Sequence, residues 1–168
     1  FNISEEIELV IEKCETKLKT WATRLVDLQH LFILGKKNGY SLAKEASLKL
    51  KEVGYLHAES YSSSALKHGP YSLIEPGNPI IFILSRDDIN DTVNNTVMEV
   101  RARGAVTWVV TDCEETPVAD DTLVLPYNSE LYGILHIIPF QLLSYYIAIQ
   151  KKHNPDYPRN LAKSVTVD

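Results

Sequence analysis

The sequence predicts an α/β protein of three layers, in which helices cover both faces of a doubly wound, mostly parallel sheet. Short apolar runs that suit buried strands alternate along the chain with longer segments whose apolar residues recur every three or four positions. This alternation is typical of parallel sheets, because each crossover between parallel strands needs a connecting helix. The length of 168 residues fits one domain.

The first part of the chain predicts two helices around one strand. Residues 5–27 predict an amphipathic helix, which Ser4 could cap. The apolar run at residues 31–34 ends at Gly35 and predicts a buried strand. Residues 41–57 predict a second helix, so these elements form the first strand–helix unit of the sheet.

The middle of the chain continues the same alternation. Residues 79–84 predict a strand, and residues 88–103 predict a helix that Gly104 ends. Residues 105–110 predict the next strand, and residues 122–126 predict a last one that ends at a proline.

A long apolar helix at residues 129–152 is expected to complete the globular part. The remaining residues have no helical or strand pattern and predict an extended tail. We therefore expect a folded unit at residues 1–152 and a separate C-terminal tail at residues 153–168.

The composition is that of a soluble globular protein, with 45% hydrophobic and 23% charged residues. The net charge of -5 argues against nucleic acid as a partner, because phosphates would be repelled by the average surface. We expect no apolar run to approach the roughly 18 residues of a membrane span, and no signal peptide is apparent. These features predict a cytoplasmic protein with no membrane partner.

The cysteines give no sign of a metal site. Cys14 and Cys113 have no second cysteine or histidine at ligand spacing, so both are interpreted as buried apolar residues in a reducing compartment. Gly35 and Gly39 do not form a dinucleotide-binding fingerprint, and we expect no cofactor. A chain that begins at Phe1 predicts a fragment of a longer polypeptide.

Three charged residues of the second predicted helix form a candidate site. Glu45, Lys49 and Glu52 are spaced at i, i+4 and i+7, so they share one stripe of the helix. On spacing alone, the favoured interpretation is a solvated ladder of ion pairs, worth a few tenths of a kcal/mol. The functional alternative is a carboxylate base with a lysine that assists it.

Further candidates lie outside that helix. His68 precedes a Gly-Pro pair and is expected in a loop or at a helix end, where a surface histidine is the ordinary alternative. His57 is expected one turn beyond Val53 and interpreted as structural, and no third ligand accompanies His57 and His68 for a metal. The stretch Ser62–Ser64 could cap a helix or hold a phosphate.

Lys163 is the candidate in the tail. A terminal lysine is normally solvated, and it becomes a nucleophile only where burial or neighbouring cations lower its pKa. The apolar residues Leu161 and Val165 would permit such burial.

Two separated motifs resemble a known enzyme family. One reads E-A-S-L-K-L-K-E from Glu45 to Glu52 and continues to K-H-G-P at residues 67–70, and the other closes the chain as N-L-A-K-S-V-T-V-D from Asn160 to Asp168. They are similar to the isomerase part of glucosamine-6-phosphate synthase, also called glutamine:fructose-6-phosphate amidotransferase. The resemblance covers essentially the whole chain and implies the second of two sugar-isomerase (SIS) subdomains, with a flavodoxin-like fold, plus the C-terminal tail.

The resemblance implies three catalytic roles at matching positions. Lys163 falls at the lysine that forms a Schiff base with the ketone of fructose 6-phosphate. Glu52 falls at the base that moves a proton between the first and second carbons of the sugar. His68 falls at the histidine assigned to ring opening, which in the family reaches the site from the neighbouring subunit.

Three supporting positions also match. Lys49 falls at a lysine that assists proton transfer, and Glu45 falls at a carboxylate that orients its neighbours on the same helix. Ala162 falls at a tail position that contacts the substrate through its backbone. The resemblance therefore implies fructose 6-phosphate and glucosamine 6-phosphate as ligands, a homodimer, and an upstream SIS subdomain and glutaminase domain in the same polypeptide.

The sequence also departs from the family pattern. Ala65 stands where glutamate is common, so the support around His68 is expected to differ. The family grips phosphate with a Ser/Thr-rich loop of the first subdomain, whereas here the loop Ser85–Asp88 carries two carboxylates that would repel it. We expect the chain by itself to be an inactive half-site. A noncatalytic phosphosugar-binding or regulatory module and a dimerisation module remain the alternatives.

Overall fold

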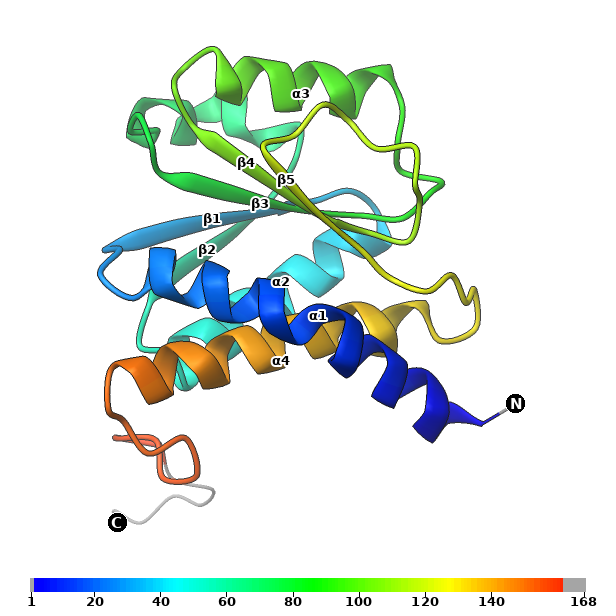
Figure 1. Ribbon diagram of the computed structural model, residues 1–168. Helices are drawn as coiled ribbons and strands as arrows, with labels where there is room; N and C mark the ends of the chain where they lie inside the picture. The colour runs from blue at the N-terminus through cyan, green and yellow to red at the C-terminus, as the bar shows by residue number, and fades with distance from the viewer. Residues whose placement is uncertain (1, 162–168) are drawn as a thin grey trace, which may run out of the picture.

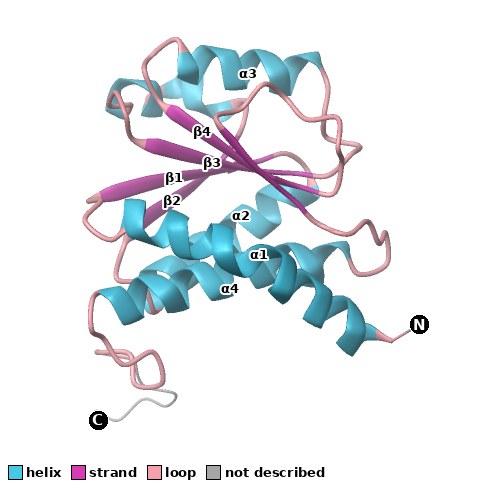
Figure 2. Cartoon of the chain, viewed as in Figure 1, coloured by secondary structure: helices cyan, strands magenta, loops and turns pink. Residues whose placement is uncertain are grey.

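The protein is built on one parallel sheet of five strands with helices on both faces (Figures 1 and 2). The computed structural model describes residues 2–161. The strand order is β2-β1-β3-β4-β5, which is the flavodoxin-like order. The strands are β1 (His30–Gly35), β2 (His57–Ser62), β3 (Pro79–Leu84), β4 (Val106–Thr111) and β5 (Asp121–Val124). The predicted three-layer fold is confirmed.

Helices are divided unequally between the two faces of the sheet (Figure 1). The longer helices are α1 (Ile3–Leu25), α2 (Asn38–Glu52), α3 (Asp91–Arg101) and α4 (Tyr132–Gln150). Helices α1, α2 and α4 cover one face, where α4 packs against both of the others. The other face is covered by α3 and by two 3-10 helices, η1 (Ala65–His68) and η2 (Pro70–Leu73).

Each face of the sheet has its own apolar core, and this explains the unbroken apolar runs in the sequence. In β3, Ile81 and Ile83 pack beneath α1, α2 and α4, whereas Ile80 and Phe82 pack beneath α3. Successive side chains of a strand point to opposite faces. A strand buried on both sides therefore needs apolar residues at every position.

The first turn after β1 depends on the absence of side chains. A Cβ atom placed on Gly35 would lie 2.2 Å from the carbonyl carbon of Gly39, so α2 can begin this close to β1 only with glycine there. Gly39 in turn lies against the backbone of β3, where an added Cβ would be 2.4 Å from the carbonyl oxygen of Ile83. The loop is thereby held tightly against the sheet.

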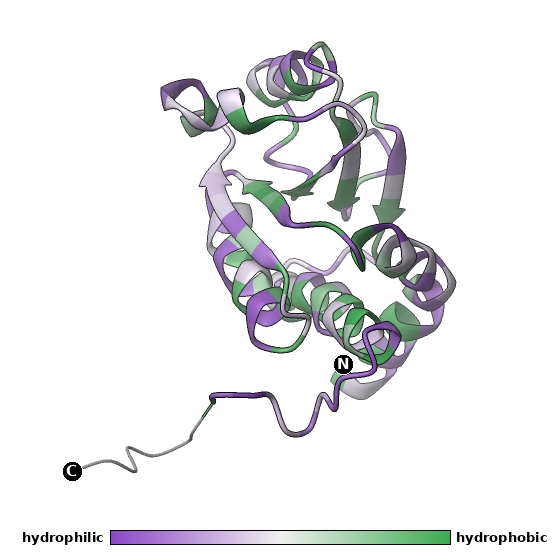
Figure 3. Ribbon diagram, turned by 90° about the vertical axis from the view of Figure 1, so that its left-hand side faces the viewer, coloured by the Kyte–Doolittle hydropathy of each residue, from purple (hydrophilic) through white to green (hydrophobic). Residues whose placement is uncertain are grey.

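The edge strand β2 was missed by the sequence prediction. Helix α2 ends at Glu52 instead of near residue 57, and His57 begins β2 instead of lying on the helix. Only Ala58 of this strand is buried, so the segment lacks the apolar pattern of the inner strands. Figure 3 shows the contrast between this hydrophilic edge and the hydrophobic central strands. A polar edge strand is a common protection against unwanted pairing.

Several helix starts also differ from the prediction. Asn2, not Ser4, caps α1, and its side chain accepts a hydrogen bond from the Ser4 amide. Helix α3 begins at Asp91 because the side chain of Asn90 accepts hydrogen bonds from the amides of Thr92 and Val93. Helix α4 begins at Tyr132, three residues later than expected.

The prediction about apolar segments was also wrong in one respect. Among the described residues, the 19-residue helix α4 is long and apolar enough to cross a membrane by length and composition alone. Half of the apolar stretch is buried inside the protein, where α4 packs against α1 and α2. A core helix of a globular domain has these same properties, so the finding is weak evidence for a membrane span.

Candidate active site

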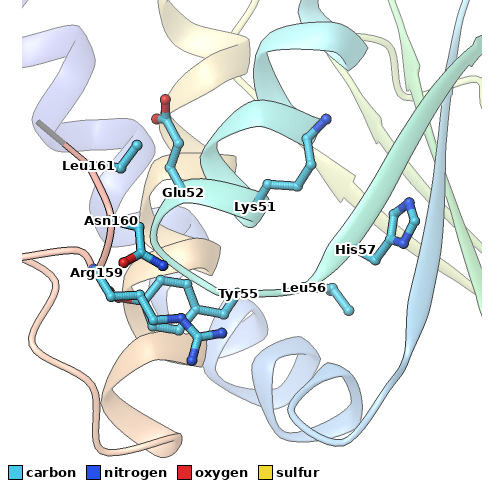
Figure 4. A pocket seen from close by; sticks show the side chains of 8 residues that line it. All are labelled: Lys51, Glu52, Tyr55, Leu56, His57, Arg159, Asn160 and Leu161. Carbon is cyan, nitrogen blue, oxygen red and sulfur yellow. The ribbon is translucent and has the colours of Figure 1, made fainter. Parts of the chain in front are cut away.

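A hollow of about 550 Å³ lies where the end of α2 meets the segment that follows α4 (Figure 4). Its lining comes from two parts of the chain that are about a hundred residues apart in sequence. The residues are Lys51, Glu52, Tyr55, Leu56, His57, Arg159, Asn160 and Leu161. Glu52, one of the predicted catalytic residues, thus shares the hollow with the last described residue of the tail, Leu161.

The turn after α2 holds the tail in this place. Tyr55 has a positive φ of 48°, and its hydroxyl accepts a hydrogen bond of 2.7 Å from the Arg159 amide. The Arg159 guanidinium lies 4.5 Å from the centre of the Tyr55 ring, an attractive cation–π contact. Lys151 Nζ donates to the carbonyl oxygens of Gly54 and Tyr55 at 2.9 and 3.3 Å. These contacts fix the direction of the chain from residue 151 to the hollow.

The predicted stripe on α2 is formed as expected. Lys49 Nζ donates to Glu52 Oε2 at 2.9 Å and lies 3.4 Å from Glu45 Oε1. The hydrogen bond to Glu52 is the main cause that raises the pKa of Lys49, so the ammonium stays protonated at neutral pH. The side chains of Lys49 and Glu52 are 27% and 29% exposed, so both are partly accessible to solvent. A cation is thus held against the candidate base.

His68 is not brought to Glu52 within one chain. Glu52 ends α2 and precedes β2, so it lies near the amino end of that strand, whereas His68 ends η1 beyond the carboxyl end. The six residues of β2 separate its two ends by roughly 20 Å. His68 is exposed. Within a single copy of the chain these two residues therefore lie near opposite ends of β2.

The other sequence candidates have mixed outcomes. Ala162 and Lys163 lie outside the described residues. Ser64 occupies the position before η1, but its side chain makes no capping hydrogen bond to that helix, so the predicted cap is wrong. His57 is exposed on the edge strand, with Nε2 3.2 Å from Glu59 Oε1. Within residues 2–161, no group of three or more His, Cys, Asp or Glu side chains is arranged to hold a metal ion.

The loop after β3 carries the two carboxylates that were expected to repel a phosphate. Asp87 is exposed, but Asp88 is buried, and its Oδ2 accepts hydrogen bonds from the amide and hydroxyl of Ser85. The loop therefore exposes one carboxylate rather than two, and the repulsion of phosphate there stays a prediction.

Sequence reasoning missed a buried polar group at the carboxyl edge of the sheet. His136 on α4 is 1% exposed, and burial lowers its pKa to about 4 although the carboxylates of Asp112 and Asp88 oppose the shift. Its Nδ1 lies 2.9 Å from the Tyr132 carbonyl oxygen, and Nε2 has no partner among the described residues. The sequence carried no signal for the grouping of His136 with Asp88 and Asp112, because one residue lies on α4 and the other two follow β3 and β4.

The fold is that of a sugar-isomerase type of domain. The family model described as "SIS domain" matches residues 24–151, and the chain belongs to this family. The sugar isomerase domain of an RpiR transcription factor from Sphaerobacter thermophilus shares the fold, with a TM-score of 0.72 and 18% identity over 88% of this chain and 86% of that one.

More specific relatives are glutamine–fructose-6-phosphate aminotransferases (isomerizing). The chain is 42% identical to the Vibrio parahaemolyticus enzyme over 158 residues, which are 92% of this chain and 26% of that protein. It is also 42% identical to the Pyrobaculum aerophilum enzyme over 94% of this chain and 27% of that protein. The C-terminal domain of the Francisella tularensis enzyme superimposes with a TM-score of 0.79 and 33% identity, over 88% of this chain and 43% of that chain. The resemblance read from the motifs is confirmed, and the chain spans about a quarter of the length of these curated relatives.

Proposed function

We propose that this chain is the C-terminal SIS part of the isomerase half of an enzyme that makes glucosamine 6-phosphate from fructose 6-phosphate and ammonia. The observation that carries the proposal is the hollow that Glu52 shares with Leu161. Lys163 follows Leu161 by two residues. Covalent geometry alone therefore keeps the Cα atoms of Leu161 and Lys163 within about 7 Å of each other.

The proposed chemistry starts at Lys163. Its unprotonated amine bonds to the second carbon of the open-chain ketose, and the ketone oxygen leaves as water, which gives an imine. The imine nitrogen withdraws electrons and acidifies the neighbouring C–H bonds. Ammonia replaces the lysine at the same carbon, which releases the free amine of Lys163.

Glu52 then carries the proton. Its carboxylate removes a proton from the first carbon and returns one to the second, while the hydroxyl on the first carbon gives up its proton and the imine nitrogen gains one, which converts the aminated ketose into the amino-aldose. Lys49 donates a hydrogen bond to Glu52 and thereby places the base. Glu45 stabilises Lys49 from the preceding turn, and the backbone of Ala162 contacts the sugar.

The proposed site is composite. His68 opens the sugar ring from the neighbouring subunit of a homodimer, and the separation of His68 from Glu52 within one chain supports this arrangement. The quarter-length match supports further domains in the same polypeptide, which we assign as an upstream SIS subdomain and a glutaminase domain. In this proposal residues 153–168 are the catalytic tail and the enzyme is cytoplasmic. No cofactor takes part in the proposed reaction.

Two assays test the proposal. The 168-residue chain mixed with fructose 6-phosphate and ammonia should give no meaningful glucosamine 6-phosphate, and robust turnover would contradict the half-site. In the full-length polypeptide, Lys163→Arg should abolish synthesis, because a guanidinium does not form the imine. The matched control is Lys152→Arg, a lysine exposed on the turn after α4, which should retain the normal rate. A normal rate in Lys163→Arg would exclude the Schiff base.

A second candidate is a noncatalytic phosphosugar-binding module. The likeness to a sugar isomerase domain of a transcription factor favours it, since this chain covers 86% of that domain. Calorimetric binding of fructose 6-phosphate to the full-length polypeptide without any turnover would select this function. Light scattering distinguishes a dimerisation role, for which self-association should occur without sugar.

A further inference from the structure

The segment that carries His68 has little regular structure of its own. It consists of η1 and η2, two 3-10 helices of four residues each, separated by the exposed Gly69 with a φ of 144°. Short 3-10 helices have poorer hydrogen-bond geometry than α-helices. Leu66 anchors the segment in the core beneath α3. The orientation of the exposed His68 must therefore depend on contacts made by its neighbours.

Those contacts converge on one carboxylate of α3. Glu99 Oε1 lies 3.3 Å from Lys67 Nζ, and Glu99 Oε2 accepts a short hydrogen bond from the Tyr71 hydroxyl. Lys67 immediately precedes His68, and Tyr71 follows it by three residues. The two oxygens of one side chain thus hold the chain on both sides of the histidine.

Arg103, two residues beyond the end of α3, contacts both Glu99 and Tyr71. Its Nη1 donates to the Glu99 carbonyl oxygen at 2.6 Å, and its guanidinium lies 4.1 Å from the centre of the Tyr71 ring. The cation–π contact and the hydrogen bond fix the ring from its face and from its hydroxyl. We name Lys67, Tyr71, Glu99 and Arg103 the Glu99 clamp.

The hydrogen bond between Tyr71 and Glu99 keeps the same protonation state throughout the neutral pH range. The hydrogen bond from Tyr71 is the main cause that lowers the pKa of Glu99, and burial with the Glu99 contact raises the pKa of Tyr71 to about 12. Glu99 is therefore a carboxylate and Tyr71 a neutral donor throughout the neutral pH range. A hydrogen bond between a neutral donor and a charged acceptor is stronger than one between neutral groups.

We propose that Glu99 is a positioning residue that, through Lys67 and Tyr71, sets the direction in which His68 is presented to the neighbouring subunit. The inference rests on the proposed function, because it assigns His68 a role in the reaction.

The test compares Tyr71→Phe and Glu99→Gln with Tyr145→Phe, an exposed tyrosine of α4, in the full-length polypeptide. Tyr71→Phe keeps the ring beside Arg103 and removes only the hydroxyl. Mass-spectrometric amide exchange over residues 64–75 should accelerate about tenfold in both clamp variants, as expected for loss of a hydrogen bond to a charged group. The kcat for glucosamine 6-phosphate should fall about tenfold with KM within about twofold, and Tyr145→Phe should change neither quantity.

A double variant separates positioning from a general structural effect. If Glu99 acts through His68, then Glu99→Gln added to His68→Asn should lower kcat no further than His68→Asn alone. Additive losses, unchanged exchange over residues 64–75, or loosened exchange with an unchanged kcat would each overturn the inference. If the parent polypeptide makes no glucosamine 6-phosphate, the proposed function fails and the positioning role fails with it, while the exchange data still decide whether the clamp holds the segment.

Discussion

Lys49 and Glu52 are hydrogen-bonded on the last turn of α2, with Lys49 Nζ 2.9 Å from Glu52 Oε2. Glu45 approaches the same ammonium from one turn earlier, at 3.4 Å. The two glutamates therefore share one cation, and the only one of them that lines the hollow is Glu52. This arrangement links a common helix-surface pattern to a specific position beside the tail.

Removal of this ammonium should affect activity far more than stability. In the full-length polypeptide, Lys49→Met should lower kcat by about a hundredfold, because Glu52 loses its hydrogen-bond donor. The free energy of unfolding should change by less than about 1 kcal/mol, since the pair is partly exposed. Lys19→Met is the matched control: Lys19 pairs with Glu15 at 2.8 Å on α1, away from the hollow. Equal activity losses in the two variants would rule out a special role for Lys49.

The Tyr55 hydroxyl should control how firmly the tail is held. Tyr55→Phe removes the acceptor of the Arg159 amide but keeps the ring beside the guanidinium. Loss of a neutral hydrogen bond worth about 1 kcal/mol should increase tryptic cleavage after Arg159 about fivefold. Tyr157→Phe, in the same segment and 82% exposed, should leave the rate unchanged. Identical cleavage of all three proteins would show that this hydrogen bond does not restrain the tail.

Buried His136 should make the fold sensitive to mild acid. Its pKa is lowered to about 4 in the folded protein, against about 6.5 when unfolded, so the unfolded chain binds more protons between these values. Stability is then complete above pH 6.5 and declines as the pH falls toward 4. Urea denaturation should show a loss of about 2 kcal/mol from pH 7 to pH 5.

His136→Gln should remove that decline, because glutamine does not titrate. His68→Gln is the control, since His68 is exposed and the decline should persist without it. An unchanged pH dependence in His136→Gln would mean that other groups cause the acid sensitivity.

The stacked indoles of Trp21 on α1 and Trp108 on β4 should stabilise the packing of α1 on the sheet. Their ring centres are 4.5 Å apart with an angle of 17° between planes, and Trp21 Nε1 donates to Asp121 Oδ2 at 2.7 Å. Trp21→Phe should cost about 2 kcal/mol of unfolding free energy in urea, through the lost hydrogen bond and weaker stacking. Combined with Asp121→Asn, the loss should be smaller than the sum of the two single changes. Strict additivity would show that this hydrogen bond contributes nothing.

Local spacing in the sequence was sufficient to predict the buried strands and the long helices. The apolar run at Pro79–Leu84 indicates a strand, and the periodic apolar residues of α1 indicate a helix. Both patterns are local, because side-chain directions repeat every two residues in a strand and every 3.6 in a helix. The same local geometry placed Glu45, Lys49 and Glu52 on one stripe. Strand β2 was not predicted, because a polar edge strand is only weakly buried and shows no such repeat.

Only the tertiary structure decided which distant segments meet. Strand β2 runs between Glu52 and His68 and places them near its opposite ends, although only sixteen positions separate them in the chain. The contact of Tyr55 with Arg159 and the clamp of Glu99 on Lys67 and Tyr71 join residues with no shared pattern. Such contacts depend on the path of the whole backbone rather than on neighbouring residues, so they cannot be predicted from any short stretch of the sequence.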